Sequence, residues 1–199
     1  MNRLLLLPVL LSIVAAAGAQ TERRIYTSSE LKAAQTRTEE SKLTKEQKKQ
    51  IEAIQDSIEH ARAIKALETL EFVMEANQLV FKRGRTAFVS SATNFVSLSD
   101  DKAVVQIAPF NDGGPNGVGG ITLEGKASNI HIKTDKKGNT SFSMAVTGTG
   151  LSATIDIYLY NGSNKVSVTV NPNFHSNKVT LIGRLLPTER ASIYKGFSF

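Results

Sequence analysis

The chain has 199 residues, no cysteine and a formal net charge of +6 at pH 7. The lack of cysteine excludes disulfide bonds, thiolate nucleophiles, iron–sulfur clusters and cysteine-ligated zinc. The basic charge is spread along the chain, and its densest cluster, Lys82-Arg83-Gly84-Arg85, is short. We interpret this cluster as a solvated turn rather than a polyanion site, and we expect no nucleic-acid partner.

The first residues, MNRLLLLPVLLSIVAAAGA, form an export signal over 1–19. Arg3 precedes an apolar run, and small residues then allow cleavage between Ala19 and Gln20. The run is shorter than the roughly 20 residues of a membrane-spanning helix, although an uncleaved N-terminal anchor is the alternative. No cysteine stands at the junction, which excludes a lipid anchor. We therefore expect a periplasmic or secreted protein whose mature chain has no transmembrane segment.

Two segments precede the main domain. Residues 20–43 are polar and carry few large apolar side chains, so they are predicted to form a flexible tether. A helix is predicted over 44–68, where Thr44 and Gln47 form a capping-box pattern at its start. A narrow apolar stripe recurs on one face of this helix at Ile51, Ile54, Ile58 and Ala61.

From 69 to 199 the pattern changes to strands with period-two alternation. Clear examples place Phe142, Met144 and Val146 on one face of a strand, and Ile155, Ile157 and Leu159 on one face of the next. Asn161-Gly162 predicts a hairpin with a type I′ turn, in which both central residues have positive φ. Because about nine or ten strands follow one another through short connections, we predict an all-β antiparallel meander.

A meander of this length must protect its edge strands, either by closing into a barrel or by folding into a sandwich. The up-and-down order favours a barrel, with the helix at one end. Strand 178–186 is apolar on both faces, so its outer face needs a cover. The candidates are helix 44–68 and the C-terminal segment that contains Ile193, Phe197 and Phe199.

Four runs of sequence carry a family resemblance: FVMEANQLVFKRGR, NFVSLSDDKAVVQIA, NGVGGITLEGKASNIHIKTDKKGN and PNFHSNKVTLIG. They are similar to a family of uncharacterised exported proteins from Bacteroides-type Gram-negative bacteria, known as a domain of unknown function. The resemblance covers about 65–199 together with the signal. It implies a lipocalin-like antiparallel barrel in a Gram-negative periplasm. It implies no activity, so no catalytic residue can be carried over.

No catalytic or metal-binding pattern stands out in the sequence. His60, His131 and His175 are far apart, and none has a carboxylate at ligand spacing. His131 is expected to face solvent. The G-x-S-x-G motif is missing, and no two carboxylates are placed to face each other across a cleft. We therefore expect no enzymatic activity, no metal and no cofactor.

Two features could contact a ligand. The Gly-rich loop 111–120 lacks the lysine of a P-loop and leads into a strand, so it is a flexible connection or a mobile lid that carries Asp112 and Asn116. Asp156 is expected to point to solvent. If it points into the barrel together with Tyr158 and Tyr160, the three side chains form a polar anchor for a ligand.

Two functions from different classes follow. The first is an exported periplasmic barrel that binds a small apolar or amphipathic ligand, since a barrel of about eight strands can hold one. The alternative is a non-catalytic structural or interaction protein of the cell envelope. In that case the tether and the helix dock an envelope protein, and side chains fill the barrel.

Overall fold

The computed structural model describes residues 27, 29, 32, 44–109, 117–149, 151–173 and 178–198. The predicted export signal, its predicted cleavage site at Ala19 and Gln20, and most of the predicted tether lie outside these residues. The chain divides into two units after Thr44. The helix and strands discussed below belong to the second unit, which begins at Lys45.

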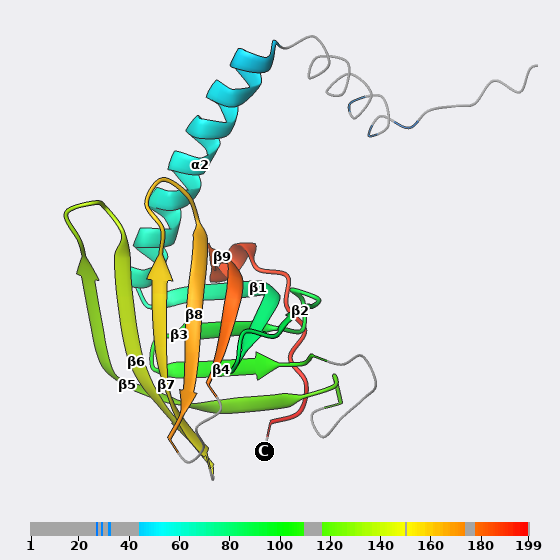
Figure 1. Ribbon diagram of the computed structural model, residues 1–199, viewed down its shortest axis with the longest axis vertical. Coiled ribbons are helices and arrows are strands. Elements are labelled where there is room, and N and C mark those ends of the chain that lie inside the picture. The colour runs from blue at the N-terminus through cyan, green and yellow to red at the C-terminus, as the bar shows by residue number, and fades with distance from the viewer. Residues whose placement is uncertain are drawn as a thin grey trace, which may run out of the picture. The chain divides into compact units, whose positions relative to one another are not determined.

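In the described part of the second unit, one α-helix precedes nine strands and a short 3-10 helix (Figure 1). Their bounds are α2 (Lys45–Glu68), β1 (Glu71–Phe81), β2 (Thr86–Phe88), β3 (Phe95–Ser99), β4 (Lys102–Ile107), β5 (Ile121–Thr134), β6 (Thr140–Gly148), β7 (Leu151–Leu159), β8 (Lys165–Pro172), β9 (Val179–Pro187) and η1 (Thr188–Arg190).

The strands form one antiparallel sheet that closes on itself. Their order is β2-β1-β3-β4-β5-β6-β7-β8-β9, and β9 also pairs with β1. This last pairing runs from Phe72 opposite Pro187 to Phe81 opposite Val179 and closes the barrel. The ring contains β1 and β3 to β9, while β2 pairs only with the end of β1. The predicted all-β antiparallel barrel preceded by a helix is therefore confirmed.

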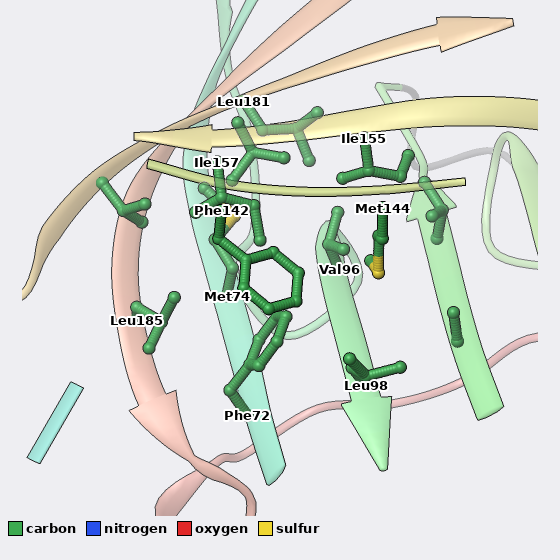
Figure 2. Packing of buried hydrophobic residues seen from close by; sticks show 14 of the residues in the cluster. Phe72, Met74, Val96, Leu98, Phe142, Met144, Ile155, Ile157, Leu181 and Leu185 are labelled. Atoms are coloured by element: carbon green, nitrogen blue, oxygen red, sulfur yellow. The ribbon is translucent and has the colours of Figure 1, made fainter. Parts of the chain in front are cut away.

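Apolar side chains fill the barrel interior (Figure 2). The members of this core cluster have exposed fractions of 0 to 6 %. Near its centre the rings of Phe72 and Phe142 meet edge to face, with their centroids 5.4 Å apart. Met74, Met144 and Ile157 point into the same space from three strands (Figure 2). These side chains are covered by one another, as in the close-packed interior of a globular protein.

The helix packs on β1 and β9 through a face that the sequence pattern does not identify. Ala63, Ala66 and Leu67, in the last turns of α2, are 0 to 3 % exposed. By contrast, Ile51, Ile54 and Ile58 of the predicted stripe are 42 %, 61 % and 46 % exposed. At roughly 100° per residue, these two sets point about 150° apart. The stripe therefore lies outside the face of α2 that packs on the barrel, although Ile58 also lines a groove beside β8 and β9. The first turns of α2 extend beyond the strands (Figure 1).

The two candidate covers for β9 lie in different places. The helix packs against β9, whereas the C-terminal segment 191–198 is hydrogen-bonded to other strands. Its contacts are with Glu75 on β1, Gln106 on β4 and Glu124 on β5. Phe199 lies outside the described residues. The cover of β9 therefore comes from α2, and the C-terminal segment covers the β4–β5 side.

The Asn161-Gly162 hairpin forms between β7 and β8, but its turn is not type I′. Only Gly162 of this pair has positive φ, at 75°. The connection is longer than two residues and is closed by a hydrogen bond from Tyr160 N–H to Lys165 O. Asn161 instead bonds to the β5–β6 turn, donating its N–H to Asn139 Oδ1 and its side-chain amide to Lys137 O. These two bonds join neighbouring hairpin turns and hold Asn161 outside the left-handed region.

Candidate functional site

The candidate ligand contacts on β7 lie on the outer surface of the barrel. Asp156, Tyr158 and Tyr160 are exposed and alternate with buried residues of the core. The two tyrosine rings meet edge on, with their centroids 5.1 Å apart. These three side chains therefore do not line the interior. Asp112 and Asn116 of the Gly-rich loop lie outside the described residues.

The histidines are not brought together into a site. His131 is exposed on β5. His60 Nδ1–H donates to the carbonyl oxygen of Ser163 over 2.9 Å, which ties α2 to the β7–β8 turn. His175 lies outside the described residues. In the part of the chain that the structure describes, no group of three or more His, Cys, Asp or Glu could hold a metal ion. None of the helices described there is long and apolar enough to cross a membrane.

A charged groove separates α2 from β8 and β9. It encloses about 610 Å³. Acidic side chains of the helix line it opposite basic ones from the rest of the domain: Glu52, Asp56 and Glu59 against Lys165, Arg184 and Arg190. Ile58 and Arg62 of the helix and Glu75 of β1 also line it. One ion pair crosses it, with Arg190 Nη1 2.7 Å from Glu59 Oε1 and 2.8 Å from Glu59 Oε2. The middle of the helix is therefore joined to the barrel by polar contacts.

Glu59 makes this junction sensitive to pH. Its hydrogen bonds to Arg190, and then the charge of Arg190 and Arg62, hold the pKa of Glu59 below its ordinary value of 4.5. A carboxyl whose pKa is lowered by folding contributes stability above its unfolded pKa, and that contribution is lost as pH falls through the folded value. The ion pair should thus stabilise the protein near neutral pH and cease to do so in acid.

We therefore expect Glu59→Gln to melt at a lower temperature than wild type at pH 7. The difference should shrink as pH falls below 4.5 and vanish once wild-type Glu59 is protonated. Thermal melts at a series of pH values measure this, with Glu52→Gln as the matched control on the same face of α2. A deficit in Glu59→Gln that stays constant down to the lowest pH would contradict the account.

An apolar stripe on α2 stays exposed. Ile51, Ile54, Ile58 and Ala61 follow one another at intervals of 3, 4 and 3 residues, which is the spacing of coiled-coil core positions. Lys48 and Arg62 flank the stripe on one side, and Gln50 and Ser57 flank it on the other. Such a surface can bury its isoleucines against a second amphipathic helix.

The comparisons with known proteins agree with this architecture. A family model described as "Domain of unknown function (DUF4251)" matches residues 54–185, from the middle of α2 to β9. The chain belongs to this family. A crystal structure of a DUF4251 family protein from Bacteroides eggerthii DSM 20697 is 46 % identical, with a TM-score of 0.63. The similarity covers 74 % of this chain and 99 % of that one. Among curated proteins, none matches the chain.

The resemblance predicted from the four sequence runs is thus confirmed for this DUF4251 protein. The charged groove was not predicted from the sequence, although a signal for it exists. Glu52, Asp56 and Glu59 recur at intervals of 4 and 3 residues, on the helix face opposite the stripe. An acidic face opposite an apolar one indicates that the two sides of α2 contact different surroundings.

Proposed function

We propose that this DUF4251 protein is a non-catalytic interaction protein of the cell envelope, exported through residues 1–19. Its outward stripe on α2 docks an amphipathic helix of a partner protein. The observation that carries the proposal is the exposure of Ile51, Ile54 and Ile58, at 42 to 61 %, on one stripe of α2 outside the face that packs on the barrel. Contiguous exposed apolar side chains of this kind are typical of protein–protein contacts.

A small apolar ligand inside the barrel is the second candidate. The core around Phe72 and Phe142 is 0 to 6 % exposed, so such a ligand would have to displace side chains that are already closely packed. A barrel of about eight strands can be filled by its own side chains or can hold one small ligand, and the packing around Phe72 and Phe142 corresponds to the first case. The interior therefore favours the interaction function over ligand binding.

The chemistry of the stripe favours a helix of another protein over a second copy of this chain. Lys48 and Arg62 form a basic flank, although Arg62 also pairs with Glu59 over 2.7 Å. An antiparallel copy would place the two basic flanks against each other, and a parallel copy would place them against Gln50 and Ser57. Neither arrangement gives charge complementarity. A partner helix with acidic residues beside its apolar stripe would place negative charges against the basic flank.

Photo-cross-linking in the native host tests the proposal. A photoreactive amino acid at position 54 should give an adduct with one polypeptide, and one at position 49, an exposed site on the opposite face, should not. The adduct should disappear when Ile51→Ser and Ile58→Ser are added to the same chain. The cross-linked segment of the partner should be an amphipathic helix with an acidic flank. A synthetic peptide with the sequence of that segment should bind the purified protein. Equal adducts at both positions, no adduct, or an adduct only with a second copy would overturn the proposal.

A further inference from the structure

A second hollow, far from α2, has a strongly basic lining. It encloses about 610 Å³ and is lined by Phe81, Lys82, Arg83, Arg85, Lys178 and Val179. Four of these six side chains are cationic and none is acidic. Basic side chains that surround a concave surface raise the local concentration of anions there.

The fold gathers this lining from two distant segments. Phe81 is paired with Val179 at the end of the β1–β9 ladder, which brings Lys178 beside the β1–β2 turn. The turn is closed by two backbone bonds, from Phe81 N–H to Arg85 O and from Gly84 N–H to Phe81 O. The β1–β9 ladder and the two turn bonds therefore bring the backbone of these cationic residues together.

The turn keeps an arginine where the backbone favours glycine. Arg83 has φ of 75° and is followed by Gly84 at 78°. A side chain in the left-handed region is unfavourable, and such outliers gather at functional sites. Within the described residues, the ion pairs do not include Arg83, Arg85 or Lys178. Arg83, Arg85 and Lys178 thus carry positive charge outside these four ion pairs.

We propose that this hollow is a binding site for a multiply charged phosphate group. The guanidinium groups of Arg83 and Arg85 present paired N–H donors that match phosphate oxygens, and Lys178 adds a point charge. Phe81 and Val179 are half-buried beside the cations and supply an apolar surface for the carbon framework attached to the phosphate. The phosphate can come from a lipid headgroup or from a soluble molecule.

This site is independent of the docking surface on α2. The helix packs near Pro187, at one end of the β1–β9 ladder, and the basic hollow lies beside Val179, at the other. Those ends are roughly 30 Å apart at the usual rise per residue of a strand. Both surfaces can therefore be occupied at once.

Two probes test the site and distinguish the sources. Inorganic pyrophosphate, titrated calorimetrically into the protein, represents soluble phosphate. Vesicles of phosphatidylcholine with phosphatidylglycerol, compared with phosphatidylcholine alone in a flotation assay, represent the lipid. The site variants are Arg85→Gln/Lys178→Gln and Arg83→Gly. The control is Lys133→Gln/Lys136→Gln, which removes two exposed charges from the β5–β6 hairpin.

We expect each site variant to weaken binding of the preferred probe by about tenfold or more, and the control to change it little. Arg83→Gly should also melt no lower than wild type, because glycine suits the left-handed backbone, so its loss of binding cannot come from unfolding. Binding of pyrophosphate supports a soluble ligand, and binding of anionic vesicles alone supports a lipid. Binding of neither probe, or equal losses in site and control variants, would overturn the proposal.

Discussion

Replacing Gly183 by alanine is expected to lower the free energy of unfolding by about 4 kcal/mol or more. A Cβ at this position would lie 1.9 Å from the carbonyl oxygen of Glu75 and 2.8 Å from Cα of Ala76. Both are backbone atoms of β1, and Gly183 is paired with Ala76 in the ladder that closes the barrel. The clash can be relieved only by moving β1 away from β9. Urea unfolding followed by circular dichroism measures the loss.

The matched control is Gly162→Ala, in the β7–β8 turn. A Cβ there meets no atom within 4 Å, but its φ of 75° is unfavourable for alanine. The control should therefore cost only about 1 kcal/mol. A Gly183→Ala protein that is as stable as Gly162→Ala would show that the β1–β9 closure does not have the described register.

Gln106→Leu is expected to cost about 4 kcal/mol, since it removes four hydrogen bonds worth about 1 kcal/mol each. Gln106 is 0 % exposed, on the outer face of β4 beneath the C-terminal segment. Its side-chain nitrogen donates to Thr93 O and Tyr194 O, and its oxygen accepts from Thr122 Oγ1 and Gly196 N–H. Leucine has a similar volume but leaves these partners without their bonds.

Limited trypsin digestion gives this prediction a second readout. The bonds to Tyr194 O and Gly196 N–H fix the segment that contains Lys195, which also pairs with Glu124 over 2.6 Å. In Gln106→Leu, the rate of cleavage after Lys195, relative to the rate after Lys165 in β8, should be higher than in wild type. Glu124→Gln serves as control, because it removes the charge that pairs with Lys195, keeps the cleavage site and should be only slightly destabilised. Unchanged stability and digestion in Gln106→Leu would mean that Gln106 does not hold the C-terminal segment.

The barrel could be predicted from the sequence because its signals are local. The alternation of Phe142, Met144 and Val146 with polar neighbours assigns one face to the core, and the same holds for Ile155 and Ile157. The exclusion of β2 from the ring could not be predicted in this way. It depends on how one edge of β1 is shared between two strands, which no local pattern encodes.

The helix shows where pattern and packing differ. The isoleucine stripe predicted that α2 forms, but the barrel-facing residues are the small Ala63 and Ala66 with Leu67. Small residues allow the helix to approach the sheet closely, yet they add little to an apolar pattern. The type I′ turn at Asn161 was wrong for a similar reason, because bonds to Lys137 and Asn139 override the local preference.

One candidate site depended on local alternation and the other on long-range register. The exposed positions of Asp156 and Tyr158 follow from their alternation with Ile157. The basic cluster of the β1–β2 turn was visible in the sequence, but its union with Lys178 was not. That union requires Phe81 to be opposite Val179, and a shift of one residue would turn the side chains to the other face.

The free energy of unfolding of the variant Ile51→Ser/Ile54→Ser/Ile58→Ser tests the central claim most directly. These side chains are 42 to 61 % exposed and lie outside the face of α2 that packs on the barrel, and serine and isoleucine have similar helix propensities. We therefore predict a value within about 1 kcal/mol of wild type, whereas Leu67→Ala on the opposite face should lose about 3 kcal/mol. A triple variant that loses as much as Leu67→Ala would contradict the account, because the stripe would then belong to the core and could not dock a partner.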